Sequence, residues 1–489
     1  MRFLSQDVML SMGVLKIPVE NPLTAMTLSE KIKYSCRRRK NFAWKESMMA
    51  VVKPFCGITY NFNRFKDLGP LVTPPYDVIS ASEQEEFYLA DPYNVIRLEL
   101  AKATPADSGT DNRYTRAAET FREWLRQGIL LQAQDPCFYI TAHSYQIGEK
   151  RRTRMGIIAR VKIEEEGSDV VLPHEQTFPA HKTDRLKLME ACRAQFSQVF
   201  SVYEDSGNVL CDIFSTCESM RPQASFSFKD GSDHQLWAIT DPNTMRTIEN
   251  AFRDKSLYIA DGHHRYETAR NYRNEMRAKG ATAGEGAHEY VMMYLSGIDD
   301  RGLTILPYHR LLAGNQPFDA DAFVAGVSEY FTVDSIHMDG LHDAGSVESK
   351  LSEAGAKSPS FVVCTRKGDC LLLQLKPGAL KNMSEDVHPA LRKLDVQVLS
   401  DLIFQKTIGF TPQDMENDEL FRFDSSIESC LAKVHSGDAE AAFLLNPTPI
   451  ENVREVAGAG LVMPRKSTFF HPKVLTGLVL NPLEDYEPR

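Results

Sequence analysis

The sequence predicts an α/β protein with mixed sheets and a phosphate-binding domain at its centre. Strand-like apolar runs alternate with amphipathic helical patterns along most of the chain, which is typical of this fold class. At residues 255–278 a short apolar strand, the turn Asp261-Gly262 and a helical pattern follow one another directly. Backbone N–H groups at the start of such a helix attract anions, so this stretch predicts a phosphate site.

Length and composition narrow the class of protein. The 489 residues exceed one ordinary core and suggest two or three domains, and 43% hydrophobic with 25% charged residues is typical of a soluble globular protein. The formal net charge of −10 argues against a general nucleic-acid binder. No apolar run is long enough to span a membrane. The nine cysteines are scattered without a C-x-x-C pair, so we expect reduced, largely buried thiols in a cytoplasmic protein.

We expect four segments. Residues 1–48 contain a basic run at 37–40 and are interpreted as a disordered or misassigned leader, with a transit peptide or a nucleic-acid-binding patch as alternatives. Residues 49–145 form an N-terminal α/β segment, residues 146–312 the central phosphate-binding domain, and residues 313–489 a C-terminal α/β domain.

The patterns along the chain predict the elements in order. In the first part, residues 51–55 read as a strand, 82–90 as a helix with acidic residues in its first turn, 95–100 as an alternating strand, and 114–127 as an amphipathic helix ended by Gly128. In the centre we expect strands at 137–143, 153–163, 197–203, 255–260 and 290–296, a hairpin at 226–239, and helices at 185–195, 211–221, 241–252 and 266–278. In the last part we expect strands at 360–365, 370–375, 441–446 and 475–480, and helices at 394–403 and 449–457.

The turn after the central strand carries Asp261, His263, His264 and Arg265 beside Gly262. An arginine binds phosphate through paired N–H groups, and a histidine can donate or transfer a proton near neutral pH. An aspartate can bind Mg²⁺ or accept the proton of a hydroxyl. The alternative is a charged turn whose histidines cap the helix or face water.

A second group of polar residues precedes and opens the predicted helix at 185–195. Glu175 is a candidate general base, and His174, Lys182 and Arg185 are candidates for holding an anion. A loop and a capped helix with surface charges is the alternative. Tyr76 and Asp77 follow two prolines that fix an extended backbone, which suits either substrate binding or a rigid structural turn.

Two basic groups lie in the last third of the chain. His309 and Arg310 are expected at the end of a strand, where they either reach a phosphate or face solvent. Residues 463–473 contain Arg465, Lys466, Ser467, Thr468, His471 and Lys473 between prolines, which suits a clamp for polyphosphate or carboxylate. A basic surface loop before the final strand is the alternative. The P-loop and dinucleotide-binding glycine motifs are both absent from the sequence.

From about Val51 to Leu480 the chain resembles the bacterial and archaeal family known as domain of unknown function 1015. The matching stretches are PPYDVI at 74–79, NVIRL at 94–98, HEQT at 174–177, DRL at 184–186, DGHHR at 261–265, HR at 309–310 and MPRKSTFFHPK at 463–473. This resemblance implies a family but no activity.

The DGHHR motif is also similar to the nucleotide-phosphate motif of ParB- and sulfiredoxin-like proteins, including archaeal free-serine kinases. This resemblance implies that Asp261, Gly262, His263, His264 and Arg265 bind nucleotide phosphate and Mg²⁺, and that Glu175 is the base. The central domain is then expected to have a ParB/sulfiredoxin-like fold. Residues 204–250 make the spacing between Glu175 and Asp261 longer than in a compact domain of that kind.

The function predicted from these residues is ATP- or ADP-dependent phosphoryl transfer to a small hydroxylated metabolite, with free serine or a relative as the first acceptor. Glu175, Asp261 and His264 are the predicted catalytic residues, and Asp261 is the predicted metal ligand. A nucleotide-binding switch of ParB type without metabolite phosphorylation, and a metal-dependent hydrolase, are the alternatives. The sequence does not determine the oligomeric state, for which a homodimer is one option.

Overall fold

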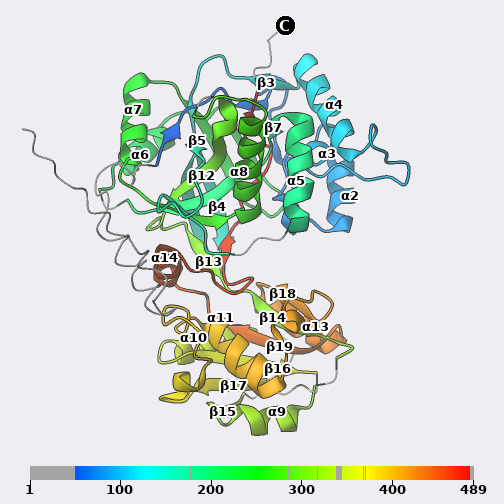
Figure 1. Cartoon of the computed structure of the whole chain (residues 1–489), viewed down its shortest axis with the longest axis vertical. Helices are drawn as coiled ribbons and strands as arrows, with labels where there is room; N and C mark the ends of the chain where they lie inside the picture. The colour runs from blue at the N-terminus through cyan, green and yellow to red at the C-terminus, as the bar shows by residue number, and fades with distance from the viewer. Residues whose placement is uncertain are drawn as a thin grey trace, which may run out of the picture. The chain divides into compact units, whose positions relative to one another are not determined.

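The computed structural model describes residues 50–484 except 176–178, 206, 285, 317, 337–343, 367 and 369, and it describes only the backbone of 179–181. The predicted leader at residues 1–48 lies outside the described residues. The described part belongs to one compact unit, Met48–Arg489. It is a mixed α/β fold with several sheets, as the sequence predicted (Figure 1).

The larger sheet has nine strands in the order β6-β11-β8-β12-β5-β4-β10-β9, with β1 also paired to β5. Its strands are β1 (Val52–Lys53), β4 (Phe138–Ile147), β5 (Lys150–Lys162), β6 (Val171–Leu172), β8 (Val199–Tyr203), β9 (Ala224–Ser227), β10 (Asp233–Ile239), β11 (Leu257–Asp261) and β12 (Tyr290–Gly297). The pairs β6–β11 and β8–β12 are parallel and the others are antiparallel. The predicted boundary at residue 145 falls within β4, so strands of two predicted segments share this sheet; the division into segments stays a prediction.

Both faces of the larger sheet are buried, because neighbouring side chains of its central strands belong to two different hydrophobic clusters. Ile158 packs in one cluster, and Ile157 and Ala159 pack in the other. The helices that cover the faces and flank them are α2 (Ala81–Ala90), α3 (Ile96–Glu99), α4 (Arg113–Arg126), α5 (Pro179–Cys192), α6 (Cys211–Ser219), α7 (Pro242–Ala251) and α8 (His263–Ala278). In Figure 1 α5 and α8 lie side by side in front of the sheet.

The second sheet has six antiparallel strands in the order β15-β17-β16-β19-β14-β18. Its strands are β14 (His309–Ala313), β15 (Phe331–Ile336), β16 (Ser360–Thr365), β17 (Cys370–Leu375), β18 (Phe421–Asp424) and β19 (Ala439–Leu445). Helices α10 (Ala344–Gly355) and α13 (Ile427–Ser436) cover one face. The other face packs against α9 (Ala320–Val327), α11 (Asp395–Val398), the π-helix η5 (Leu399–Ile408) and α14 (Ile450–Gly458). The short helix α12 (Pro412–Met415) follows η5.

After α14 the chain returns to the larger sheet and runs beside elements from the start of the chain. Strand β20 (Phe469–His471) pairs with β13 (Thr304–Leu306), and β21 (Asn481–Pro482) pairs with β7 (Ala194–Gln195). Isolated bridges join Leu480 to Ile58, and Ile58 itself lies in the β2 (Ile58–Tyr60) and β3 (Leu130–Gln132) pair. This return places residues 463–473 next to the end of β11.

Four predicted elements differ from the structure. Residues 95–100 form helix α3 and not a strand, because the Asn94 side chain accepts a hydrogen bond of 2.8 Å from the Ile96 N–H and opens a helical turn. Helix α5 spans Pro179–Cys192, whereas the sequence predicted a helix at 185–195. Helix α8 begins at His263, not at Tyr266, because Gly262 serves as its N-cap. Residues 475–480 make only isolated bridges.

The prediction that all the cysteines are reduced thiols is wrong for one pair. Cys364 and Cys370 form a disulfide between the neighbouring strands β16 and β17, where they lie opposite each other with Cα atoms 4.2 Å apart. Their spacing in the sequence gives no C-x-x-C signal, and only the strand register brings them together.

No helix in the described part of the chain combines the length and the apolar composition needed to cross a bilayer.

Gly156 tests the packing of the central strands. A Cβ at this position would lie 2.2 Å from the ring of Tyr294, which is buried, packs on Phe200 at 5.1 Å and accepts a hydrogen bond from Arg154. The ring has no room to move, so Gly156→Ala is expected to lower the free energy of unfolding by about 1–3 kcal/mol. Urea unfolding checks this, with Gly109→Ala as the control because a Cβ there meets no atom within 4 Å. Equal midpoints for the two variants would contradict the prediction.

Candidate functional site: an anion-binding helix N-terminus

The turn between β11 and α8 requires glycine for two reasons. Gly262 has φ +88, a left-handed conformation that other residues adopt at a cost. A Cβ at Gly262 would also lie 2.9 Å from Nε of Arg265. Within the described part of the chain no side chain caps α8, so the N–H groups of its first turn are available to a ligand. The expected strand–turn–helix geometry is present.

Asp261 lies between two cations at the end of β11. One carboxylate oxygen accepts a hydrogen bond from Arg265 and the other from Lys473. Arg265 also donates to the carbonyl oxygen of Gln198 in the loop before β8. Burial by itself would raise the pKa of Asp261, but the charges of Lys473 and Arg265 outweigh it and hold the pKa well below its usual range. The three side chains therefore form an ionised cluster with one net positive charge.

The first turn of α8 opens into a cavity of about 240 Å³. Of the predicted site residues, those that line it are Tyr76, Asp77, Glu175, Asp261, Gly262, His263, His264, Arg265, Lys466, Thr468 and Lys473. The structure thus brings together residues from four separate parts of the sequence. Lys466 differs from the other basic residues of the lining: among the residues that the structure describes it forms no ion pair, and its Nζ lies over the ring of Tyr308, 4.9 Å from the centroid.

His263 lines the cavity and packs as a neutral ring against the neutral ring of His174. Their ring centroids are 4.7 Å apart with planes at 88°, and Nε2 of His263 accepts a hydrogen bond of 3.3 Å from the His174 backbone N–H. The ring proton of neutral His263 is therefore on Nδ1, which lies 3.8 Å from Oε2 of Glu175. Burial lowers the pKa of each of the two histidines to about 3.

The segment after α14 pairs with the end of β6 and completes the cavity. The Met463 N–H donates to the His174 carbonyl at 2.8 Å, and Glu175 and Met463 form a parallel bridge. Thr468 Oγ1 lies 3.2 Å from Nε2 of His174. The Lys466 N–H donates to Oε1 of Glu175 at 3.4 Å, so Glu175 is held at the cavity wall with its side chain 31% exposed.

The structure places His309 and Arg310 at the start of β14 and away from this cavity. His309 accepts a hydrogen bond of 3.3 Å from the Leu445 N–H within the second sheet. Arg310 is buried and donates to the carbonyl oxygens of Tyr308, Arg465 and Lys466. Burial lowers the pKa of Arg310 to about 9. Arg310 therefore holds the backbone that carries Lys466.

Three further predicted residues have partners outside the cavity. Lys182 pairs with Glu267 at 2.8 Å, and the Ser467 hydroxyl donates to the Pro464 carbonyl. Arg185 is buried, donates to the Glu99 carbonyl at 2.7 Å and stacks over Tyr76 with its guanidinium carbon 4.2 Å from the ring centroid. Arg185 thereby fixes Tyr76, which does line the cavity.

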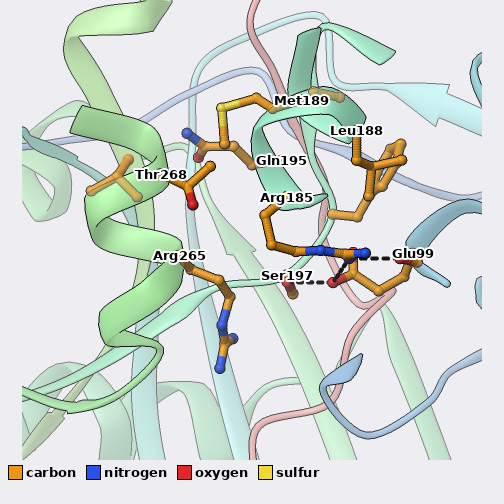
Figure 2. A pocket seen from close by; sticks show the side chains of 11 residues that line it. Glu99, Arg185, Leu188, Met189, Gln195, Ser197, Arg265 and Thr268 are labelled. Atoms are coloured by element: carbon orange, nitrogen blue, oxygen red, sulfur yellow. Dashed lines mark hydrogen bonds and ion pairs between the residues drawn. The ribbon is translucent and has the colours of Figure 1, made fainter. Parts of the chain in front are cut away.

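A smaller cavity of about 40 Å³ lies behind Arg265 and is bordered by Arg185, Glu99 and Thr268 (Figure 2). Figure 2 shows Arg185 reaching Glu99, while Ser197 also donates to Glu99 at 2.9 Å. The two arginines enter from α5 and α8, so this polar layer connects the helices beneath the site.

Both carboxylate oxygens of Asp261, the predicted metal ligand, accept a hydrogen bond from a cation in this structure. Among the described residues no group of three or more His, Cys, Asp and Glu side chains is arranged to hold a metal ion.

Three residues of the lining were not predicted: Ala260, Tyr308 and Asp418. Arg465 was predicted only as part of the basic stretch 463–473. Arg465 pairs with Asp418 at 2.9 Å. Arg465 stands inside the basic stretch 463–473, and Tyr308 directly precedes the predicted His309-Arg310 pair, so proximity to known candidates was the available signal. Asp418 has no such signal in the sequence.

Fold and site together define a mixed α/β protein with a cavity at the uncapped N-terminus of a helix. The chain belongs to the family described as protein of unknown function (DUF1015), whose model matches residues 52–397. The family resemblance predicted from the sequence is thereby confirmed. None of the curated proteins is significantly similar to the chain.

Among solved structures, the chain is similar to a mutant free serine kinase in complex with ADP, with 13% identity, 67% of this chain and 90% of that chain covered, and a TM-score of 0.32. A conserved hypothetical protein from Pyrococcus furiosus matches with 13% identity, 63% and 89% coverage and a TM-score of 0.30. SbnI from Staphylococcus aureus with a C-terminal truncation matches with 11% identity, 67% and 87% coverage and a TM-score of 0.31. At these TM-scores the function has to be inferred from the site itself.

The buried histidines predict a pH dependence of stability. Their folded pKa values of about 3 lie below the value of about 6.5 for an exposed histidine, so below about pH 6.5 the unfolded chain binds protons that the folded chain does not. Stability must therefore fall as the pH falls through this window. Between about pH 7 and about pH 5, we expect the free energy of unfolding of His263→Gln to fall by roughly 2 kcal/mol less than that of the unchanged protein.

Urea unfolding at the two pH values measures this difference. His435→Gln, at an exposed position on α13, is the control and is expected to behave like the unchanged protein. An identical loss of stability in His263→Gln and in the control would show that His263 is not a buried neutral ring.

Proposed function

We propose that this protein is a nucleotide-dependent phosphotransferase that acts on a small hydroxylated metabolite. One observation carries the proposal: a single cavity contains the uncapped N-terminus of α8, the ammonium group of Lys466 and the carboxylate of Glu175. An anion-binding helix end beside a carboxylate is the combination that transfer of a phosphoryl group to a hydroxyl requires.

The terminal phosphates of ATP or ADP would bind at the first turn of α8. The N–H groups of this turn and the helix dipole favour a negative charge there. Lys466 supplies the cation that no described carboxylate neutralises, and the Arg265–Asp261–Lys473 cluster adds its net positive charge. In this proposal Asp261 orients the two cations, and Arg265 acts as a positioning residue because Asp261 and Gln198 occupy its guanidinium.

Glu175 would accept the proton of the acceptor hydroxyl. The hydroxyl oxygen attacks the terminal phosphorus, the bond from that phosphorus to the bridging oxygen breaks, and the shortened nucleotide leaves with the electron pair. Oε1 of Glu175 is held by the Lys466 N–H, while Oε2 faces the Nδ1–H of His263. His264, at the second position of α8, lines the same cavity and is close to the bound phosphate in this proposal.

Free serine is the first acceptor to test, because the DGHHR motif at 261–265 resembles that of free-serine kinases. Mg²⁺ commonly accompanies nucleotide phosphates. No group of three or more His, Cys, Asp and Glu side chains among the described residues is arranged to hold a metal ion, and no step of the proposed reaction is assigned to a metal.

Substitution of Lys466 tests the proposed phosphate site through nucleotide affinity, without a measurement of turnover. Lys466→Met is expected to weaken binding of ATP and ADP about tenfold or more, because it removes a charge-assisted contact while leaving the backbone in place. Calorimetric titration of the full chain, with and without Mg²⁺, measures the affinities. Lys381→Met, at an exposed position, is the matched control. Equal affinity in the two variants would exclude Lys466 from the phosphate site.

Substitution of Glu175 tests the proposed proton transfer from the acceptor hydroxyl. Glu175→Gln keeps the size of the side chain but cannot accept a proton, so we expect phosphorylation of the acceptor to fall roughly 10²- to 10⁴-fold with nucleotide affinity unchanged. Mass spectrometry of the product measures turnover, and Glu119→Gln on the exposed face of α4 is the control. Unchanged turnover in Glu175→Gln would remove Glu175 as the base. Nucleotide hydrolysis without any phosphorylated acceptor would instead favour the nucleotide switch.

A further inference from the structure

Besides the two cavities described above, a cavity of about 210 Å³ lies between η5 and β18 and is called the second cavity below. Residues 463–465 form part of its wall. It is several times larger than the liquid volume of about 30 Å³ that one water occupies. Its walls include Phe404 and Gln405 from η5, Gln397 from α11, and Phe421 and Phe423 from β18. None of these residues was singled out from the sequence as part of a site.

The lining combines flat apolar faces with hydrogen-bonding amides. Phe404 and Phe421 are buried with ring centroids 4.9 Å apart, and Phe423 is half-buried at the cavity. Gln397 and Gln405 are half-buried, and each can both donate and accept hydrogen bonds. This chemistry suits a planar heteroaromatic ring: the aromatic faces can stack on it and the amides can bind its polar edge.

Two arginines border this cavity and stack on the same aromatic ring. The guanidinium carbons of Arg310 and Arg465 lie 5.6 Å and 5.5 Å from the centroid of Phe423. Arg310 is 4% exposed and donates only to backbone carbonyls among its described partners. A buried cation without a carboxylate favours a ligand that carries negative charge nearby.

The second cavity adjoins the phosphate site through one shared residue, Arg465. Arg465 lines both cavities, and Lys466, the next residue, lines only the phosphate site. Arg310 lines the second cavity and holds the carbonyls of Arg465 and Lys466 at 3.3 Å and 3.1 Å. Lys466 has φ +58, an uncommon conformation for a residue with a side chain, and these bonds keep it there.

The wall formed by η5 is also unusual. A π-helix over residues 399–408 is rare, because its hydrogen bonds are less favourable than those of an α-helix, and π-helical turns recur at functional sites. Here it places Ser400, Phe404 and Gln405 on one cavity.

We propose that the cavity between η5 and β18 binds the base of the nucleotide whose phosphates bind at the N-terminus of α8. This inference rests on the proposed function and adds to it the site that distinguishes a nucleotide from inorganic polyphosphate. Arg465 lies between the two ends of the ligand, and Arg310 positions the backbone that joins the two cavities.

The experiment compares ADP with inorganic pyrophosphate, which has the phosphates but no base. Two variants alter the second cavity: Gln405→Leu removes an amide at nearly constant size, and Ser400→Phe fills the space. Both are expected to weaken ADP binding about tenfold, the effect of losing one stacking or edge contact with a base, and to leave pyrophosphate binding unchanged. Gln413→Leu, exposed on α12, is the matched control. Circular dichroism confirms that each variant is folded, and Gln405→Leu decides the test if Ser400→Phe is not.

The possible outcomes separate the two proposals. Pyrophosphate binding that equals ADP binding in the unchanged protein overturns the base site and leaves the phosphate site standing. Unchanged ADP affinity in folded Gln405→Leu and Ser400→Phe, or an equal loss for both ligands, also overturns the base site. No binding of either ligand to the unchanged protein overturns the proposed function, and the base site with it.

Discussion

The ionised cluster of Arg265, Asp261 and Lys473 is the interaction on which the site depends. Asp261 ends β11, Arg265 lies in the first turn of α8, and Lys473 comes from the segment that returns from the second sheet. Removing charges from water is costly, and a partly buried ion pair is a weak source of net stability. Its value here is positional, because a bonded carboxylate fixes three separate pieces of chain at one point. The same cluster leaves one positive charge next to a helix N-terminus.

Two uncharged histidine rings, His174 and His263, pack next to this charged cluster. His174 and His263 meet edge to face, and the tautomer of His263 is set by the backbone N–H of His174. Because the rings carry no charge, they can be buried without partners of opposite sign. They connect β6, α8 and the segment around Thr468, so the Glu175 carboxylate stands on a rigid base.

Some of the candidate residues predicted from the sequence line the cavity, and others do not. The DGHHR turn was predicted as a strand, a glycine turn and a helix, and these elements are present, with only the start of α8 displaced by three residues. Glu175, Lys466 and Lys473 were chosen as candidates because polar residues were dense around them, and all three line the cavity. His309 and Arg310 were chosen as a basic pair at the end of a predicted strand, yet both are buried within β14 of the second sheet. Local density of charge indicates that a residue has a polar partner, but not whether that partner is a ligand or the protein backbone.

The sequence by itself determined the elements whose causes are local: the glycine turn at 262, the amphipathic helices and most of the apolar strands of a mixed α/β protein. Only the tertiary structure decided which distant residues meet. Lys473 reaches Asp261 across 212 positions, and Cys364 meets Cys370 through a strand register that no spacing rule contains. Asp418 and the aromatic wall of the second cavity likewise had no signal in the sequence. The physical reason is that long-range pairing follows from the burial of whole faces, whereas sequence patterns report only the face that each element buries.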